Sequence, residues 1–138
     1  MRGSFIEFDH TGDLGVEVEA GSREELFAQA LAGMASLMVE PEGVEPREQR
    51  EIRINGASDA ELMHDLLAEA LVLFFADGFI WTEARVSAYP GGLKATLGGE
   101  LFDPSRHCLI REIKAVTHHQ LSVEPRDGRF WARIIFDV

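Results

Sequence analysis

The chain has 138 residues and a mass of 15.3 kDa, and 46% of its residues are hydrophobic, which suits one soluble domain spanning residues 1–138. Its formal net charge is −11, from 24 acidic and 13 basic residues, so we expect no stable direct binding to nucleic acid. No apolar run approaches the ~20 residues of a membrane span, and no signal peptide is evident at the start. The single cysteine, Cys108, excludes an internal disulfide. We therefore expect a cytoplasmic protein with no membrane partner.

Two segments, residues 22–39 and 58–78, have the apolar spacing of amphipathic helices. Each opens with Ser-x-x-Glu, the capping box that satisfies backbone N–H groups at a helix start. The second segment ends at Gly78, a residue that commonly terminates helices. Each helix is therefore expected to bury one apolar face against the rest of the protein.

The remaining regular segments predict strands. These are residues 4–10, 14–20, 50–55, 81–89, 93–100, 119–125 and 128–138. Turn signals at Pro90-Gly91-Gly92 and at Asp127-Gly128 predict two hairpins. The element order, with two helices inside a series of strands, predicts an α+β fold. We expect a two-layer sandwich in which the two main helices pack on a mixed or largely antiparallel sheet.

The stretch FDHTGDLGVEV, residues 8–18, crowds chemically versatile groups into one turn. Asp9 and Asp13 are four residues apart with Gly12 between them, so a turn can bring the two carboxylates towards one point. Carboxylate oxygens suit hard cations such as calcium, magnesium or manganese, although two are too few for a site. The local alternative is a capped turn, in which Asp and Thr side chains bond nearby backbone amides.

Further carboxylates stand at the other end of the sequence, where the last predicted strand finishes at Asp137 and Val138. These two residues offer a side-chain carboxylate and an α-carboxylate side by side. If this strand pairs beside residues 13–18, three or four carboxylate groups converge. The sequence alone does not establish that pairing.

Histidine and cysteine provide a weaker candidate site. His107, Cys108, His118 and His119 are residue types that zinc accepts, but no CxxC or HExxH spacing accompanies them. No nucleophile elbow supports Cys108 as a nucleophile, and no glycine-rich phosphate loop follows a strand. The sequence therefore favours neither a zinc site nor an autonomous nucleotide enzyme.

Lys114 lies in REIKAVTHH, where apolar residues surround it and acidic residues dominate the neighbouring sequence. It can pair with a carboxylate as a structural tie. It can also offer a cation to a phosphate or to a carboxylate of a partner. Sequence alone favours the structural tie.

Several motifs occur in one order along residues 5–138: FDHTGDLGVEV, SREELFAQA, GELFDPSRH, EIKAVTHHQL and IIFDV. In this combination the chain resembles the archease family. The resemblance implies an accessory protein with no catalytic activity of its own. Its implied partner is the GTP-dependent RNA ligase that joins RNA 3′-phosphate or cyclic-phosphate ends to 5′-hydroxyl ends in tRNA splicing and RNA repair. In that family the protein promotes guanylylation of the ligase's active-site histidine and allows multiple turnover.

The resemblance also implies roles for individual residues. It implies a divalent metal ion, calcium in a structure and magnesium or manganese as alternatives in function, held by Asp13, Asp137 and Val138. The family's functional lysine falls on Lys114, which would contact the partner or a phosphate. Asp9 and His10 would support the turn that aims Asp13. The oligomeric state, the RNA substrate and the physiological metal stay open.

Two other classes of function remain as alternatives. A general chaperone-like interaction module is supported by the acidity and small size of the chain. A small metal-dependent hydrolase is supported only by the carboxylate residues. The three classes differ in what they need, because an activator requires the ligase, a chaperone helps unrelated clients and a hydrolase acts alone.

Overall fold

The computed structural model describes residues 4–10 and 12–138, except for the side chains of residues 8–10. The elements in chain order are β1 (Ser4–His10), β2 (Asp13–Ala20), α1 (Arg23–Met38), β3 (Glu48–Asn55), α2 (Asp59–Asp77), β4 (Phe79–Tyr89), β5 (Gly92–Leu101), β6 (Ala115–Val116), β7 (Ser122–Arg126) and β8 (Arg129–Asp137). Two helices combine with antiparallel strands, so the predicted α+β class is confirmed.

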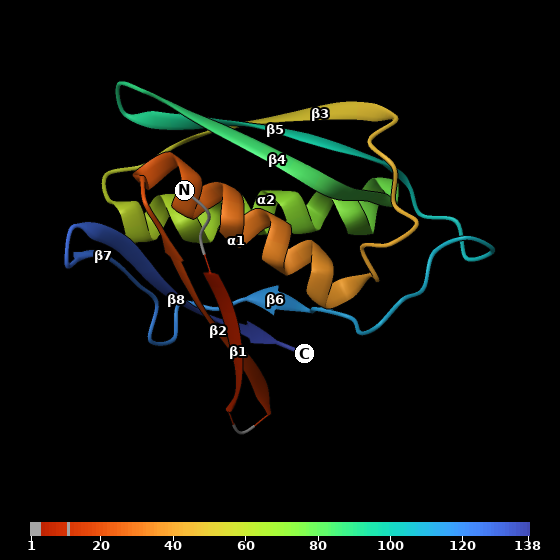
Figure 1. Cartoon of the computed structure of the whole chain (residues 1–138), viewed down its shortest axis with the longest axis horizontal. Coiled ribbons are helices and arrows are strands. Elements are labelled where there is room, and N and C mark those ends of the chain that lie inside the picture. Colours follow the sequence, from red (N-terminus) through yellow and green to blue (C-terminus); the bar gives the residue numbers. More distant parts are fainter. Residues whose placement is uncertain (1–3, 11) are drawn as a thin grey trace.

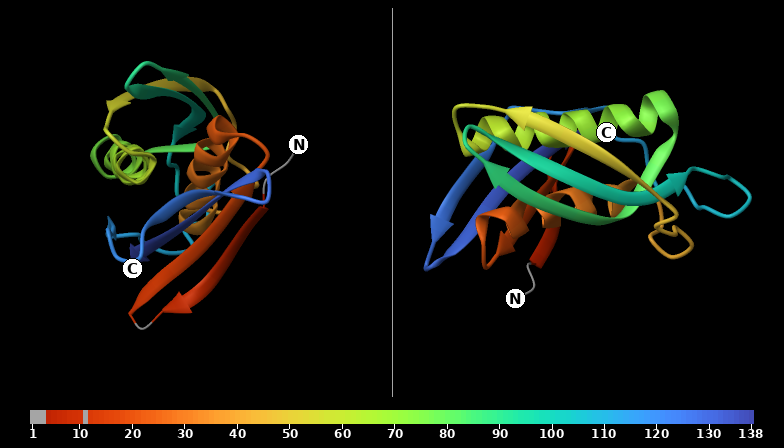
Figure 2. Two further views of the ribbon diagram at one scale, coloured as in Figure 1. Left: turned by 90° about the vertical axis from the view of Figure 1, so that its left-hand side faces the viewer. Right: turned by 90° about the horizontal axis from the view of Figure 1, so that it is seen from above.

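The strands form two sheets, and the two helices lie between them (Figure 1). The five-stranded sheet has the order β1-β2-β8-β6, with β7 also paired to β8, and the three-stranded sheet has the order β3-β5-β4. Seen from the side, the β1–β2 hairpin projects beyond the helices (Figure 2). The sequence predicted helices packed on a sheet, and the structure adds that a separate sheet covers each side of the helical layer.

Local side-chain chemistry explains where the helices begin and end. Ser22 Oγ accepts a hydrogen bond from the Glu25 amide at 3.2 Å, and Ser58 caps α2 in the same way at 3.2 Å. Helix α2 ends at Gly78, whose φ of 72° is a left-handed conformation that glycine adopts without strain. The serine half of each predicted capping box and the predicted stop are thus confirmed. No helix of the described residues is long and apolar enough to span a membrane.

Two predicted hairpins are also present. Strands β4 and β5 are joined through Pro90 and Gly91, and β7 and β8 are joined through Asp127 and Gly128. Both residues of the second turn have positive φ, 50° and 76°, as a two-residue turn that matches the twist of the strands requires. The two-residue strand β6 was missed because so short a segment carries no periodic signal.

One continuous cluster of buried residues joins the helical layer to both sheets. Its largest fully buried side chains include Phe27 of α1, Phe79 and Trp81 of β4 and Phe136 of β8. The Trp81 indole N–H donates to the Leu31 carbonyl at 2.9 Å, which satisfies the polar atom of a buried aromatic ring and ties β4 to α1. This core fixes the two sheets relative to the helices.

Gly33 of α1 lies against the ring of Phe5 from β1, and an ideal Cβ at that position would be 2.1 Å from a ring carbon. Gly33→Ala is therefore expected to lower the free energy of unfolding by about 1–3 kcal/mol, because the ring must move. Chemical denaturation followed by circular dichroism measures the change. At a helix position without such a contact, the same substitution stabilises by ~1 kcal/mol. Stabilisation here would contradict the packing, whereas the additional change Phe5→Ala should offset the clash.

Candidate functional site

One end of the five-stranded sheet gathers the predicted site residues. Asp13 of β2 is the register partner of Asp137 in β8, and Asp137 is also the partner of Ala115 in β6. On the other side, Asp13 pairs with His10 of β1. Four strands thus contribute one residue each to a single row across the sheet. The last strand therefore pairs beside residues 13–18, which is the condition for the carboxylates to converge.

The two aspartates lie on the outer face of this sheet, away from the helices. Their neighbours Leu14 and Phe136 are a cross-strand pair in the buried core, and successive side chains of a strand point to opposite faces. Directly paired residues have Cβ atoms roughly 4.5–5.5 Å apart, so Asp13 and Asp137 bring two like charges side by side. Both residues are partly exposed. A cation would offset their repulsion.

Lys114 and Val138 adjoin this pair. The Lys114 backbone N–H donates to the Asp137 carbonyl at 2.7 Å, and its side chain is exposed. No carboxylate of the described residues forms an ion pair with its ammonium, so the structural tie favoured by the sequence is not seen in that part of the chain. Val138 directly follows Asp137 and is 37% exposed. The Lys114 backbone therefore adjoins the strand end that carries Asp137.

The chemistry of these donors suits a hard cation, since carboxylate oxygens are the ligands that calcium, magnesium and manganese prefer. Among the described residues, no three His, Cys, Asp or Glu side chains are placed so that they could hold a metal ion. The expected ligand set is of a different kind, because it combines two aspartates with the α-carboxylate of Val138. This assignment stays a prediction.

Asp9 and His10 were expected to support the turn that aims Asp13. Their backbones pair with Leu14 and Asp13 respectively, whereas their side chains lie outside the described residues. The turn itself passes through Gly12, whose φ of 73° is a left-handed conformation that favours glycine. The backbone of the turn is thus compatible with the expectation, and the roles of the two side chains stay predictions.

His64 of α2 holds the edge strand β6 from the helix side. Its Nε2 lies 3.0 Å from the Val116 carbonyl, its Nδ1 lies 3.0 Å from Asp65 Oδ1, and its ring stacks on His118 with a centroid distance of 3.7 Å. No signal in the sequence marked the contacts of His64 with Val116 and His118, because they join segments far apart in the chain. His64 therefore anchors the strand that directly follows Lys114.

Loss of the His64 hydrogen bond is expected to loosen β6. In His64→Leu, exchange of the Lys114 amide with solvent should accelerate, by roughly tenfold at most, since a hydrogen bond of this kind contributes ~0.5–1.5 kcal/mol. Hydrogen exchange measured by NMR tests this. The matched variant His64→Gln keeps an N–H donor and should exchange more slowly than His64→Leu. Equal exchange in both variants would show that the hydrogen bond does not hold the strand.

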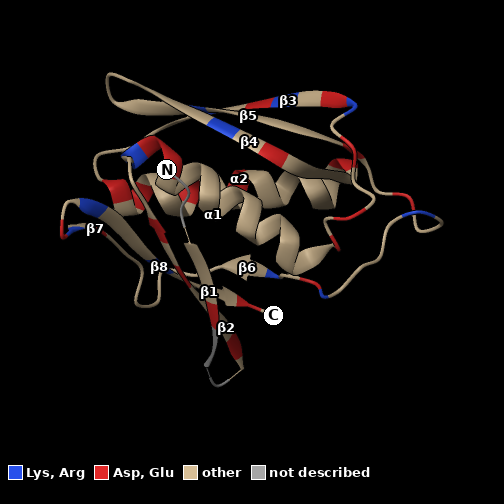
Figure 3. Ribbon diagram, viewed as in Figure 1, with Lys and Arg blue, Asp and Glu red and all other residues tan. Residues whose placement is uncertain are grey.

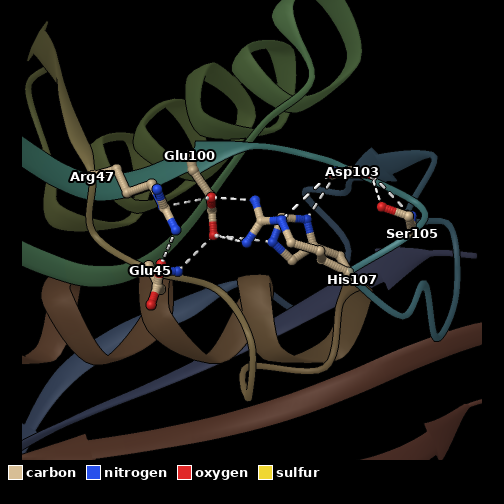
Figure 4. Close-up of polar contacts among 7 residues, drawn as sticks. Glu45, Arg47, Glu100, Asp103, Ser105 and His107 are labelled. Carbon is tan, nitrogen blue, oxygen red and sulfur yellow. Dashed lines mark hydrogen bonds and ion pairs between the residues drawn. The ribbon is translucent and has the colours of Figure 1, made fainter.

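A second polar cluster surrounds the buried carboxylate of Glu100, where the loops around residues 45 and 106 meet the end of β5 (Figure 4). Glu100 of β5 is 4% exposed and accepts hydrogen bonds from the Arg106 guanidinium at 2.6 Å, the Glu45 amide at 2.8 Å and His107 Nε2 at 3.0 Å. Arg47 Nε lies 3.3 Å from the same carboxylate. The Arg106 hydrogen bond is the main reason that the pKa of Glu100 falls from 4.5 to about 2. This carboxylate ties two loops to the three-stranded sheet.

The cluster also accounts for His107. The Asp103 amide donates to His107 Nδ1 at 2.8 Å, so Nε2 carries the proton that is donated to Glu100. Both ring nitrogens are therefore used in the fold. Cys108 is exposed, and His118 makes its ring contact with His64. His107 and His118 thus take part in two separate clusters of the fold.

Cross-strand contacts order the outer face next to the candidate site. The Trp131 indole N–H and the Arg133 guanidinium donate to the two carboxylate oxygens of Glu17, at 3.0 and 3.2 Å. These hydrogen bonds, the one from Trp131 first, lower the pKa of Glu17. Because Glu17 lies on β2 and the two donors lie on β8, the contacts support the strand register that places Asp13 opposite Asp137.

Comparisons with known proteins agree over nearly the whole chain. The model of the archease protein family (MTH1598/TM1083) matches residues 5–138. Protein archease of Methanopyrus kandleri is 33% identical over 136 residues, which cover 96% of this chain and 97% of that protein. Protein archease of Thermococcus kodakarensis is 32% identical over 136 residues, with coverage of 95% and 96%.

Solved structures share the same architecture. The solution structure of protein 1598 from Methanobacterium thermoautotrophicum has a TM-score of 0.76 and 30% identity, and the match covers 97% of this chain and 98% of that one. A crystal structure from Thermotoga maritima, described as an archease and possible chaperone, has a TM-score of 0.63 at 23% identity, covering 95% and 94% of the two chains. The second likeness concerns the fold alone.

Proposed function

The chain belongs to the archease family, and from this premise we propose that it is a non-catalytic accessory protein that activates a GTP-dependent RNA ligase. The ligase joins RNA 3′-phosphate or cyclic-phosphate ends to 5′-hydroxyl ends. This protein promotes guanylylation and multiple turnover of the ligase in tRNA splicing or RNA repair, in the cytoplasm. The observation that carries the proposal is the pairing of Asp13 with Asp137, whose carbonyl accepts a hydrogen bond from the Lys114 amide at the same end of the sheet.

In this proposal Asp13, Asp137 and the α-carboxylate of Val138 hold a divalent ion. The ion supplies positive charge for phosphate oxygens near the GTP site of the ligase. Lys114 presents its exposed ammonium to a phosphate or to a carboxylate of the partner. His64 keeps the strand that follows Lys114 in place through the Val116 carbonyl.

The net charge of −11 supports an electrostatic role in docking. Acidic residues appear on both helices and on strands of both sheets (Figure 3). Such a distribution steers a basic partner surface towards the protein and raises the rate of association more than the affinity. The partner in this proposal is the RNA ligase.

Multiple-turnover RNA joining tests the proposal. The cognate ligase is given GTP, a divalent ion and an RNA with a 3′-phosphate, and this protein is added at less than one equivalent. Stimulation of repeated turnover is expected, whereas the protein alone should join or hydrolyse nothing. A folded protein that leaves an active ligase unchanged would contradict the proposal. Protection of unrelated proteins from aggregation would favour the chaperone alternative.

A further inference from the structure

Most basic side chains of this acidic protein form ion pairs with carboxylates. Arginines on both sheets, on α1 and in the loops form ion pairs, for example Arg23 with Asp59 at 2.7 Å and Arg129 with Glu19 at 2.7 Å. Among the described residues, the basic side chains without an ion pair are Arg85, Lys94, Arg111 and Lys114. Of these, Arg111 donates to the Leu37 carbonyl.

Arg85 and Lys94 lie together on the outer face of the three-stranded sheet, far in the fold from the candidate metal residues. Lys94 of β5 is the register partner of Ser87 in β4, and Thr96 of β5 is the partner of Arg85. The four side chains alternate with buried residues such as Ala95, so they share the face that points away from the helices. Figure 3 shows basic segments on β3 and β4 of this sheet.

These four residues, together with Val86, line one surface hollow with a volume of about 270 Å³. Two cations and two hydroxyl groups therefore surround the same space. Arg85 and Ser87 are exposed, and Lys94 and Thr96 are partly exposed, so a ligand can reach all four. The donor set is that of an anion site, because it offers positive charge and hydroxyl donors but no carboxylate.

The strand register makes this arrangement costly without a ligand. On its other side, Lys94 is directly opposite Arg53 of β3, and like charges directly opposite in a sheet are destabilising. The positive charge of Arg53 is partly compensated by the Glu51 carboxylate at 3.1 Å. Lys94 has no carboxylate partner among the described residues. An anion in the hollow would offset the repulsion.

We propose that the hollow formed by Arg85, Ser87, Lys94 and Thr96 binds the phosphodiester backbone of single-stranded RNA. Arginine, lysine, serine and threonine are the side chains that most often contact phosphates in nucleic-acid complexes. Arginine can bind two phosphate oxygens at once, and lysine contributes a point charge. A second hollow shares Lys94 and Thr96 and extends over β3 past Gln49, Arg50 and Glu51, whose carboxylate is paired with Arg53. A ligand with successive phosphates can therefore continue across the sheet.

The net charge predicts that this contact is weak by itself, in agreement with the expectation of no stable nucleic-acid binding. Its effect grows when the protein already sits on a partner that holds the RNA, because the second contact then becomes intramolecular. The choice of RNA as the source of the phosphates rests on the proposed function. The binding test below needs no ligase, so the two proposals can fail separately.

The test is an NMR titration of the isotope-labelled, full-length protein with an unstructured RNA oligonucleotide at low salt. Backbone amide shifts are expected at the four hollow residues and their neighbours in β4 and β5. Binding should weaken as salt rises, with a slope of about −1.4 in a double-logarithmic plot if two phosphates are neutralised. Shifts elsewhere, or none at all at millimolar RNA, would overturn the proposal.

Variants and competing ligands test whether RNA binds specifically at the hollow. Arg85→Gln with Lys94→Gln should lower RNA affinity at least tenfold without lowering thermal stability, because the change removes the Lys94–Arg53 repulsion. Arg126→Gln removes an exposed charge on the other sheet, and it should leave the RNA shifts unchanged. An equal loss in Arg126→Gln would indicate general electrostatics and contradict the site. Shifts of the hollow with an acidic peptide but not with RNA would likewise overturn the assignment to RNA.

Discussion

Replacing Asp13 with asparagine is expected to reduce stimulation of the RNA ligase at least tenfold while leaving the fold intact. The side chain keeps its size but loses the charge that binds a divalent ion. Mutation of residues that only hydrogen-bond to metal ligands typically lowers metal affinity or activity by about 10–100-fold, so loss of a ligand should cost at least as much. The substitution also removes one of two like charges at a cross-strand pair, so the melting temperature should change by less than about 4 °C. Multiple-turnover joining and thermal denaturation measure the two effects.

The control for Asp13→Asn is Asp127→Asn, the same substitution at an exposed turn of the same sheet. Asp127 has a φ of 50°, which asparagine also adopts readily, so neither folding nor stimulation should change. Calorimetric titration with calcium and manganese provides a readout that needs no ligase, and Asp13→Asn should weaken ion binding. Removal of Asp137 and Val138 should have the same effect on stimulation. Normal stimulation by the folded Asp13 variant would refute the metal site.

Replacing Glu100 with glutamine is expected to lower the free energy of unfolding by about 3 kcal/mol. The variant leaves the buried ring N–H of His107 and the exposed guanidinium of Arg106 without the anionic acceptor that both share. Urea denaturation at neutral pH measures the loss. Glu124→Gln is the matched control, because Glu124 pairs with Arg126 at the surface, where such a pair contributes less than about 1 kcal/mol. Equal losses in the two variants would contradict the buried network.

Acid should remove the contribution of Glu100 in a defined range. Its pKa is about 2 in the folded protein and 4.5 ordinarily, so the folded state favours the ionised form. The stabilisation is therefore fully present above pH 4.5 and is lost as the pH falls towards 2. The difference in unfolding free energy between the wild type and Glu100→Gln should shrink over this range. A difference that stays constant with pH would show that the carboxylate charge is not its source.

The sequence predicted those parts of the fold that short-range chemistry decides. Ser22, Ser58 and Gly78 mark helix ends because their roles involve residues within one turn, and Asp127-Gly128 marks a hairpin because both positions adopt positive φ. The division of the strands into two sheets depends instead on pairings between distant segments. The Glu17–Arg133 contact, for example, joins residues 116 positions apart.

The candidate site was predictable in part for the same reason. Asp13, Asp137 and Lys114 stood out as residue types and through the family resemblance, and their proximity follows from the pairing of β8 with β2 and β6. No local signal marked His64 as the residue that holds β6. Likewise, no local signal marked Glu100 as a buried carboxylate, and only the fold brings Arg47 and His107 to it.

The central position of β8 also affects the order in which the protein can fold. Strands β3, β4 and β5 with helix α2 form a continuous part of the chain, residues 48–101, so their sheet needs only moderately long loops to close. Strand β8 follows every other element, yet it joins β2, β6 and β7 into one sheet. Contacts between such distant segments carry a large entropy of loop closure and slow folding. During synthesis on the ribosome, the row that contains Asp13 and Asp137 is therefore completed only after all other strands have been made.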